Sequence, residues 1–342
     1  MALTTNQINY LNAGLMIASC VLAFAFPFEL FLFSYAVLGP LHYLTEISWL
    51  HERNYFTGGE RRKKTQRAHK GWLILVGVTM VALIVGFVAA EGVGSPLNPK
   101  WEITLFYLVL VTASLVTVIK QRSARVILLV SALVLFGLLS ISRYYVILAF
   151  FIVTIIHVLI FTGAFVFYGA LKGRSRSGML SLAVFLICTI SFFVFTPAGH
   201  AAGNYIQQSY RSFNGLNAEL IKLFRFGLGT TASEIYESRG GLVVMRLIAF
   251  AYTYHYLNWF SKTSIIKWHE VPRTRIVVMI LIWIGALALY VWDYDTGMAV
   301  LYFLSILHVM LEFPLDHLTF VGIGRELYAW AGSTRRDFAA AD

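Results

Sequence analysis

Long apolar stretches separated by short polar loops make up most of this sequence. A membrane-spanning helix needs roughly 20 mostly apolar residues, and ten stretches reach or approach that length. They cover 9–26, 29–50, 72–90, 101–119, 126–141, 144–171, 179–197, 242–260, 276–292 and 297–316. The pattern predicts an all-α, polytopic integral membrane protein with about ten transmembrane helices in a single domain, 1–342.

Basic residues predict the orientation of these helices. Lys and Arg gather after the second, fourth, sixth, eighth and tenth stretches, whereas the alternate loops are poor in them. Because Lys and Arg favour the cytoplasmic side, both termini are expected in the cytoplasm and the protein in the cell (cytoplasmic or inner) membrane. The long outer loop 199–241 is expected to contain a short amphipathic helix at the membrane interface, as a cap or a lid.

Composition agrees with a membrane protein. Of the 342 residues, 58% are hydrophobic and only 13% are charged, against about 25% charged in soluble proteins. The net charge of +10 is explained by the basic loops, so no nucleic-acid partner is expected. Only Cys20 and Cys188 occur, each in an apolar stretch, which excludes a disulfide framework and a cysteine-based metal motif.

Ionisable residues inside the apolar stretches are the candidates for function. The pattern His-x-x-x-Glu-x-x-x-x-His occurs twice, at 42–51 and at 308–317. Residues four positions apart lie on one face of a helix, so each His–Glu pair presents two ligand-type groups in one direction. Such groups are costly in a membrane and usually face a functional centre. Two pairs in two predicted helices therefore indicate a buried polar centre, most simply a metal site.

Four histidines are the first candidate ligands: His42, His157, His255 and His308. They fall in the second, sixth, eighth and tenth predicted spans, which cross in the same direction, so their imidazoles can converge on one ion. Imidazole suits iron, zinc and copper, and Glu46 and Glu312 can either ligate the metal or orient the imidazoles. A lone membrane histidine such as His157 can instead form a hydrogen bond to a neighbouring helix.

His51 and His317 are second-tier candidate ligands. Each lies nine positions after the first histidine of its motif, on the opposite face of a straight helix. Pro314 can kink the second motif and bring His317 round, whereas nothing comparable interrupts the first.

Three other polar residues are expected to play no part in ligation. His69 and His200 lie in predicted polar loops and are expected to be solvated. Arg246 lies inside the eighth predicted span, where it can pair with a buried carboxylate or extend its head group to the interface.

The order of these motifs resembles the Brp/Blh family of bacterial and archaeal membrane β-carotene dioxygenases. The matching segments are Gly39-Pro40-Leu41-His42-x-x-x-Glu46, Ile155-Ile156-His157, Tyr252-Thr253-Tyr254-His255 and Leu307-His308-Val309-Met310-Leu311-Glu312-Phe313. Glu46 and Glu312 stand where the family has aspartate, Trp259 stands where it has a further histidine, and no carboxylate follows His157 closely. The resemblance implies a membrane enzyme that uses non-haem iron and O₂ to split a polyene centrally, giving retinal.

The leading hypothesis is a membrane-embedded oxygenase for an apolar polyene or lipid. Its cofactor is expected to be Fe(II), mononuclear or di-iron, with O₂ as co-substrate and a lipophilic small molecule as substrate. Two alternatives remain open at this point. Histidines on several helices can ligate haem b in a membrane cytochrome, and His and Glu together can form the proton or cation relay of a transporter.

Overall fold

The computed structural model describes residues 3–55, 63–93, 99–119, 121–140, 152–198, 202–262, 266–267 and 270–339. Within these residues the chain is helical and contains no strand, which confirms the predicted all-α class. His200 and the first part of the sixth predicted span, 144–151, lie outside them.

The helices of the described residues divide between two compact units of the chain. Unit 1 comprises Met1–His42 and Thr154–Tyr290, and unit 2 comprises Tyr43–Val153 and Val291–Asp342. In chain order the helices are α1 Thr5–Ala25, α2 Pro27–Phe33, the π-helix η1 Ser34–Leu38, α3 Gly39–Glu52, α4 Lys63–Val93, α5 Pro99–Thr117, α6 Arg122–Ser140, the π-helix η2 Ile152–Phe161, α8 Thr162–Lys172, α9 Arg176–Val194, α10 Asn204–Tyr210, the 3₁₀ turn η3 Arg211–Phe213, α11 Asn214–Leu223, α12 Ala232–Tyr236, α13 Arg239–Ser261, α15 Arg273–Trp292 and α16 Tyr294–Ala339.

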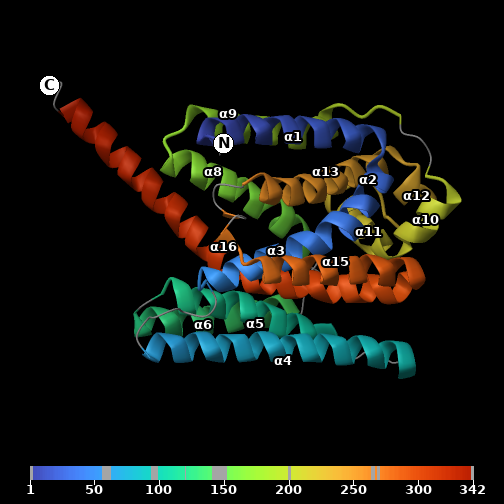
Figure 1. Ribbon diagram of the computed structural model, residues 1–342, viewed down its shortest axis with the longest axis horizontal. Helices are drawn as coiled ribbons and strands as arrows, with labels where there is room; N and C mark the ends of the chain where they lie inside the picture. Colours follow the sequence, from blue (N-terminus) through green and yellow to red (C-terminus); the bar gives the residue numbers. More distant parts are fainter. Residues whose placement is uncertain are drawn as a thin grey trace. The chain divides into compact units, whose positions relative to one another are not determined.

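Helix α13 forms the core of unit 1, since almost every residue along it is buried. Helices α1 and α9 lie side by side, and α1 also packs on α13 (Figure 1). A polar contact fixes the α1–α13 packing: Asn12 Oδ1 accepts hydrogen bonds from the hydroxyls of Tyr254 (3.2 Å) and Ser261 (2.9 Å). A buried amide is costly without such partners, so this contact also sets how the two helices align.

The start of α13 depends on a cap and a glycine. The hydroxyl of Ser238 accepts a hydrogen bond from Gly241 N (2.9 Å), which satisfies one of the N–H groups exposed at a helix start. A Cβ at position 241 would overlap the backbone carbonyls of Glu234 and Ile235 in α12. Glycine therefore allows α12 to lie directly against the first turn of α13.

Unit 2 is organised around α16, which packs against α4 and α5. The rings of Phe106 and Phe313 meet edge-on, with 5.5 Å between centroids, and Trp72 Nε1 donates to Val109 O (3.1 Å) between α4 and α5. Pro314 lies inside α16. Figure 1 shows that α16 bends, with its C-terminal part running in a new direction, as expected where proline removes a backbone hydrogen bond.

Seven helical segments of the described residues are long and apolar enough to cross a membrane. They are Thr5–Ala25, Pro27–Glu52, Gln66–Ala89, Ile155–Lys172, Arg176–Val194, Arg273–Trp292 and Tyr294–Ala331. The fourth and fifth predicted spans coincide with shorter apolar stretches, Ile103–Thr117 and Ser123–Val134. The eighth coincides with α13, which is long enough but is not among the seven. The exposed side chains support membrane association, because α15 is apolar after its first turn yet buries only Met279.

Three expectations from the sequence need correction. The helix of the last predicted span does not end near Asp316, because α16 continues to Ala339. His69 is not solvated: α4 begins at Lys63, ahead of the apolar run, and carries the buried His69 side chain within the helix. Arg246 is buried, and within the described residues it has no carboxylate partner; its Nη2 donates to Pro197 O (3.0 Å) and its guanidinium lies over the Phe24 ring.

The outer loop 199–241 contains more helix than the single segment expected from the sequence. Its described part forms α10, η3, α11 and α12. Leu216 and Leu220 are buried on α11, which packs against α13, whereas Leu223 and Leu228 are exposed. Helix α11 therefore covers the core helix of unit 1 with Leu216 and Leu220.

Candidate functional site

Helix α3 positions the first candidate ligands. It follows the π-helix η1, a rare element that is often found at functional sites. Two hydrogen bonds hold η1 in place: Ser34 Oγ pairs with Thr253 Oγ1 of α13 at 2.7 Å, and Trp283 Nε1 of α15 donates to Val37 O at 2.9 Å. His42 and Glu46 then lie one turn apart on α3, and both side chains are buried.

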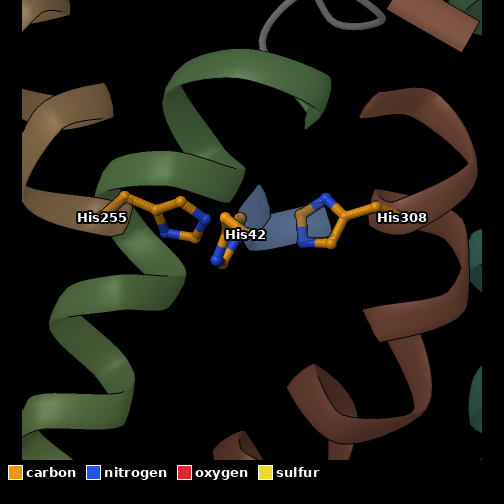
Figure 2. Close-up of side chains that lie close together, drawn as sticks. All are labelled: His42, His255 and His308. Carbon is orange, nitrogen blue, oxygen red and sulfur yellow. The ribbon is translucent and has the colours of Figure 1, made fainter. Parts of the chain in front are cut away.

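Unit 1 brings three predicted ligands together: His42, His157 and His255. Each side chain is at most 4% exposed. The ring centroid of His255 lies 4.7 Å from that of His42 and 4.9 Å from that of His157. Figure 2 shows the rings of His42 and His255 next to each other, and one nitrogen of each lies within 4.8 Å of the other. The three histidines come from α3, η2 and α13, three segments that are far apart in the sequence.

Thr162 orients one of these imidazoles, and the sequence analysis did not identify it. Its hydroxyl forms a 2.7 Å hydrogen bond with His255 Nδ1, and both groups are buried. A hydrogen bond at one ring nitrogen holds the ring direction, as is usual around metal-ligating histidines. Nε2 is then the His255 atom that would bind a metal.

Aromatic side chains line the His42 ring. Tyr256 lies 5.0 Å from it and Trp259 lies 5.7 Å from it, measured between centroids, and both side chains are buried on α13. Trp259 is the residue that stands in place of the second histidine in the resembling family. Its position beside His42 makes it part of the apolar wall of the imidazole cluster.

Unit 2 contains the candidate carboxylate ligands. His308 Nε2 lies 3.1 Å from Glu46 Oε2 and 3.6 Å from Glu312 Oε2, and all three side chains are at most 3% exposed. The ring of Tyr43 lies 4.9 Å from the His308 ring. Carboxylates buried this deeply are costly unless they are paired, protonated or bound to a metal.

Asp316 is a further carboxylate that the sequence analysis missed. It follows His308 and Glu312 at the same spacing of four, so the three residues share one face of α16. Its side chain is 2% exposed, and neither carboxylate oxygen has a hydrogen-bond partner among the described residues. The spacing of four residues was the signal available in the sequence, but the predicted span ended at this residue. Asp316 was therefore not among the predicted ligands.

The two second-tier candidate ligands, His51 and His317, differ in burial. The His51 side chain is exposed at the end of α3. His317 is half-buried, and its Nδ1 forms a 2.6 Å hydrogen bond with the carbonyl of Phe313 in its own helix. His317 therefore engages the backbone beside Pro314, whereas His308, Glu312 and Asp316 lie buried on another face of the helix.

Comparison of the sequence with protein-family models and with curated proteins, and of the structure with solved structures, found no match. The class that the structure itself defines is a helical, membrane-associated protein with buried His and carboxylate groups of the type that can hold a metal ion.

Proposed function

We propose that this protein is an integral membrane oxygenase that uses non-haem Fe(II) and O₂ on an apolar polyene or lipid. The observation that carries the proposal is the buried cluster of His42, His157 and His255, in which Thr162 orients one ring. Imidazole nitrogens with nearby carboxylates form the ligand type of non-haem iron sites. Within the resemblance described above, the substrate would be a carotenoid and the product a retinal-like aldehyde.

The spacing of the imidazoles favours non-haem iron over haem. Two histidines that ligate one haem iron lie on opposite faces of the porphyrin plane. The centroid distances of 4.7 and 4.9 Å in the cluster are too short for a porphyrin to lie between the rings. Trp259, whose ring lies 5.7 Å from that of His42, could not pass protons in the relay that a transporter would need.

Each group of residues has its own role in the proposed reaction. His42, His157 and His255 would hold the iron, which when bound supplies the activation of O₂ next to the substrate double bond. Thr162 keeps His255 directed at the metal. Tyr256 and Trp259 would exclude water and line the path of a lipophilic substrate, which would enter from the bilayer.

The proposed topology follows from the charge pattern and the described helices. Ten crossings arise if α13 and the shorter apolar stretches of α5 and α6 also span the cell membrane. Both termini would then lie in the cytoplasm, because the Lys- and Arg-rich loops favour that side.

Iron content and product formation test the proposal on the detergent-purified full chain. The wild type should contain iron without a Soret band and should convert β-carotene to retinal in the presence of O₂, as measured by chromatography. The His157→Ala variant should lose iron and form no product. Ile160→Ala is the matched control, because Ile160 lies on the same π-helix with an exposed side chain. Full iron retention by His157→Ala would refute the ligand assignment, and a Soret band would refute non-haem iron.

A further inference from the structure

We propose that the buried Arg246 forms a binding site for a phosphate group, carried by a membrane lipid or free in solution. Arg246 lies on α13 in unit 1 and is 1% exposed. His255 follows nine residues later, on the opposite face of a straight helix. The site is therefore separate from the imidazole cluster, and the inference does not rest on the proposed reaction.

Most of the hydrogen-bonding capacity of Arg246 is unused. Its Nη2 donates to Pro197 O at 3.0 Å, whereas Nε and Nη1 are buried and have no acceptor among the described residues. The centroid of the Phe24 ring lies 5.3 Å from the guanidinium carbon, and such a contact offsets only part of the cost of burying a cation. Buried donors of a charged group are costly to leave unpaired, so an acceptor is expected beside them.

The surrounding helices offer no counterion for this guanidinium. Helices α1 and α9 both pack on α13, and none of these three helices contains an Asp or a Glu. The connecting segment 195–203 after α9 contains none either. A buried cation without a charge partner destabilises the fold. The negative charge is therefore left to a ligand.

The position of Arg246 selects the class of anion. Phe24 lies in the last turn of α1, Pro197 follows the end of α9, and Arg246 lies near the start of α13. Helices α1 and α9 are long and apolar enough to cross a membrane, so their ends would lie at the depth of the lipid headgroups. Phosphate is the anion that phospholipids present at this depth. A guanidinium binds it through two parallel hydrogen bonds.

Exposed apolar side chains beside the site fit the acyl chains of a lipid. Phe195 is 63% exposed, and its ring meets that of Phe24 edge-on with 5.7 Å between centroids. Leu22 on α1 and Val194 on α9 are also exposed. Nε and Nη1 of Arg246 are enclosed, so a phosphate group reaches them only when neighbouring side chains shift. Phe195 has room to do so, because most of its surface is exposed.

Thermal unfolding of the delipidated, detergent-purified full chain tests the inference. The probes are dihexanoyl phosphatidylglycerol, dihexanoylglycerol, which lacks the phosphate, and inorganic phosphate. A ligand of the folded state raises the unfolding temperature as its concentration rises, which gives its affinity. The phospholipid should stabilise the wild type, and dihexanoylglycerol should not. Arg246→Met keeps an unbranched side chain without the charge, and should bind the phospholipid about 10- to 100-fold more weakly.

Two further variants complete the test. Arg239→Met is the matched control, because Arg239 is exposed at the start of the same helix and its loss changes the net charge equally. This variant should bind the phospholipid as the wild type does. Arg246→Lys keeps the charge but loses the paired donors, so it should bind about tenfold more weakly. It decides the question if Arg246→Met does not fold.

Each outcome supports or overturns the phosphate site. Stabilisation of the wild type by the phospholipid alone would identify a lipid headgroup as the ligand, and stabilisation by inorganic phosphate would identify a site that also accepts the free anion. No stabilisation by either phosphate probe would overturn the inference. Equal phospholipid affinity in the wild type and a folded Arg246 variant, or equal stabilisation by dihexanoylglycerol, would overturn it too.

Discussion

The hydrogen bond between Thr162 and His255 gives the sharpest test of the proposed metal centre. The Thr162→Val change removes the hydroxyl and keeps the branched shape of the side chain. His255 Nδ1 then loses its 2.7 Å partner in a buried environment. The ring can adopt the other tautomer or rotate, so Nε2 is no longer held toward a metal. We expect weaker metal binding in a protein that still folds.

Two effects of similar size set the expected magnitude. Removing a partner of a metal-ligating histidine typically lowers metal affinity by about 10- to 100-fold, which corresponds to about 1.4–2.8 kcal/mol. Leaving a buried polar group without its partner costs about 1–3 kcal/mol of folding stability. A membrane protein with a large helical core should tolerate this loss, so the change in affinity is measurable on folded material.

Competition with a chelator of known affinity measures the change, using Fe(II) or Zn(II) and the detergent-purified chain. Thr79→Val is the matched control. Thr79 is as deeply buried as Thr162, but its hydroxyl bonds only to Leu75 O of its own helix, so its loss should leave metal affinity unchanged. Equal metal affinity in Thr162→Val and wild type would refute the orienting role of Thr162.

Two further predictions concern the helices of the outer loop. Backbone N–H groups of Thr230 and Leu228 donate to the exposed Glu234 carboxylate and hold its pKa below the usual value of 4.5. The ionised Glu234 carboxylate therefore contributes fully to stability above pH 4.5, and this contribution is lost as the pH falls through the lower pKa of the folded state. Hydrogen exchange of the loop in the wild type should show the loss. An identical pH profile in Glu234→Gln would contradict the prediction. Gly241→Ala should lower the thermal unfolding temperature, because a Cβ at this position overlaps the backbone of α12. Gly285→Ala is the control and should not lower it, because a Cβ at position 285 meets open space. Equal unfolding temperatures for the two variants would contradict the close packing of α12 on α13.

Helical periodicity explains why much of the candidate site could be predicted from the sequence. Ionisable residues in long apolar stretches are rare, so His42, His157 and His255 stood out without any knowledge of the packing. The spacing of four placed Glu46 one turn after His42, and α3 has that arrangement. The all-α class followed from the same apolar stretches.

Residues that act through tertiary contacts could not be predicted in this way. Thr162 carries no charge and matches no motif, and its role depends on α13 bringing His255 beside it. Asp316 was missed for a different reason: hydropathy placed the end of a span at that residue, whereas α16 continues far beyond it as a helix. Polarity near a predicted boundary looks like a normal helix end. A continued spacing of four after His308 and Glu312 is the stronger signal, because it keeps a carboxylate on the buried face regardless of where the membrane ends.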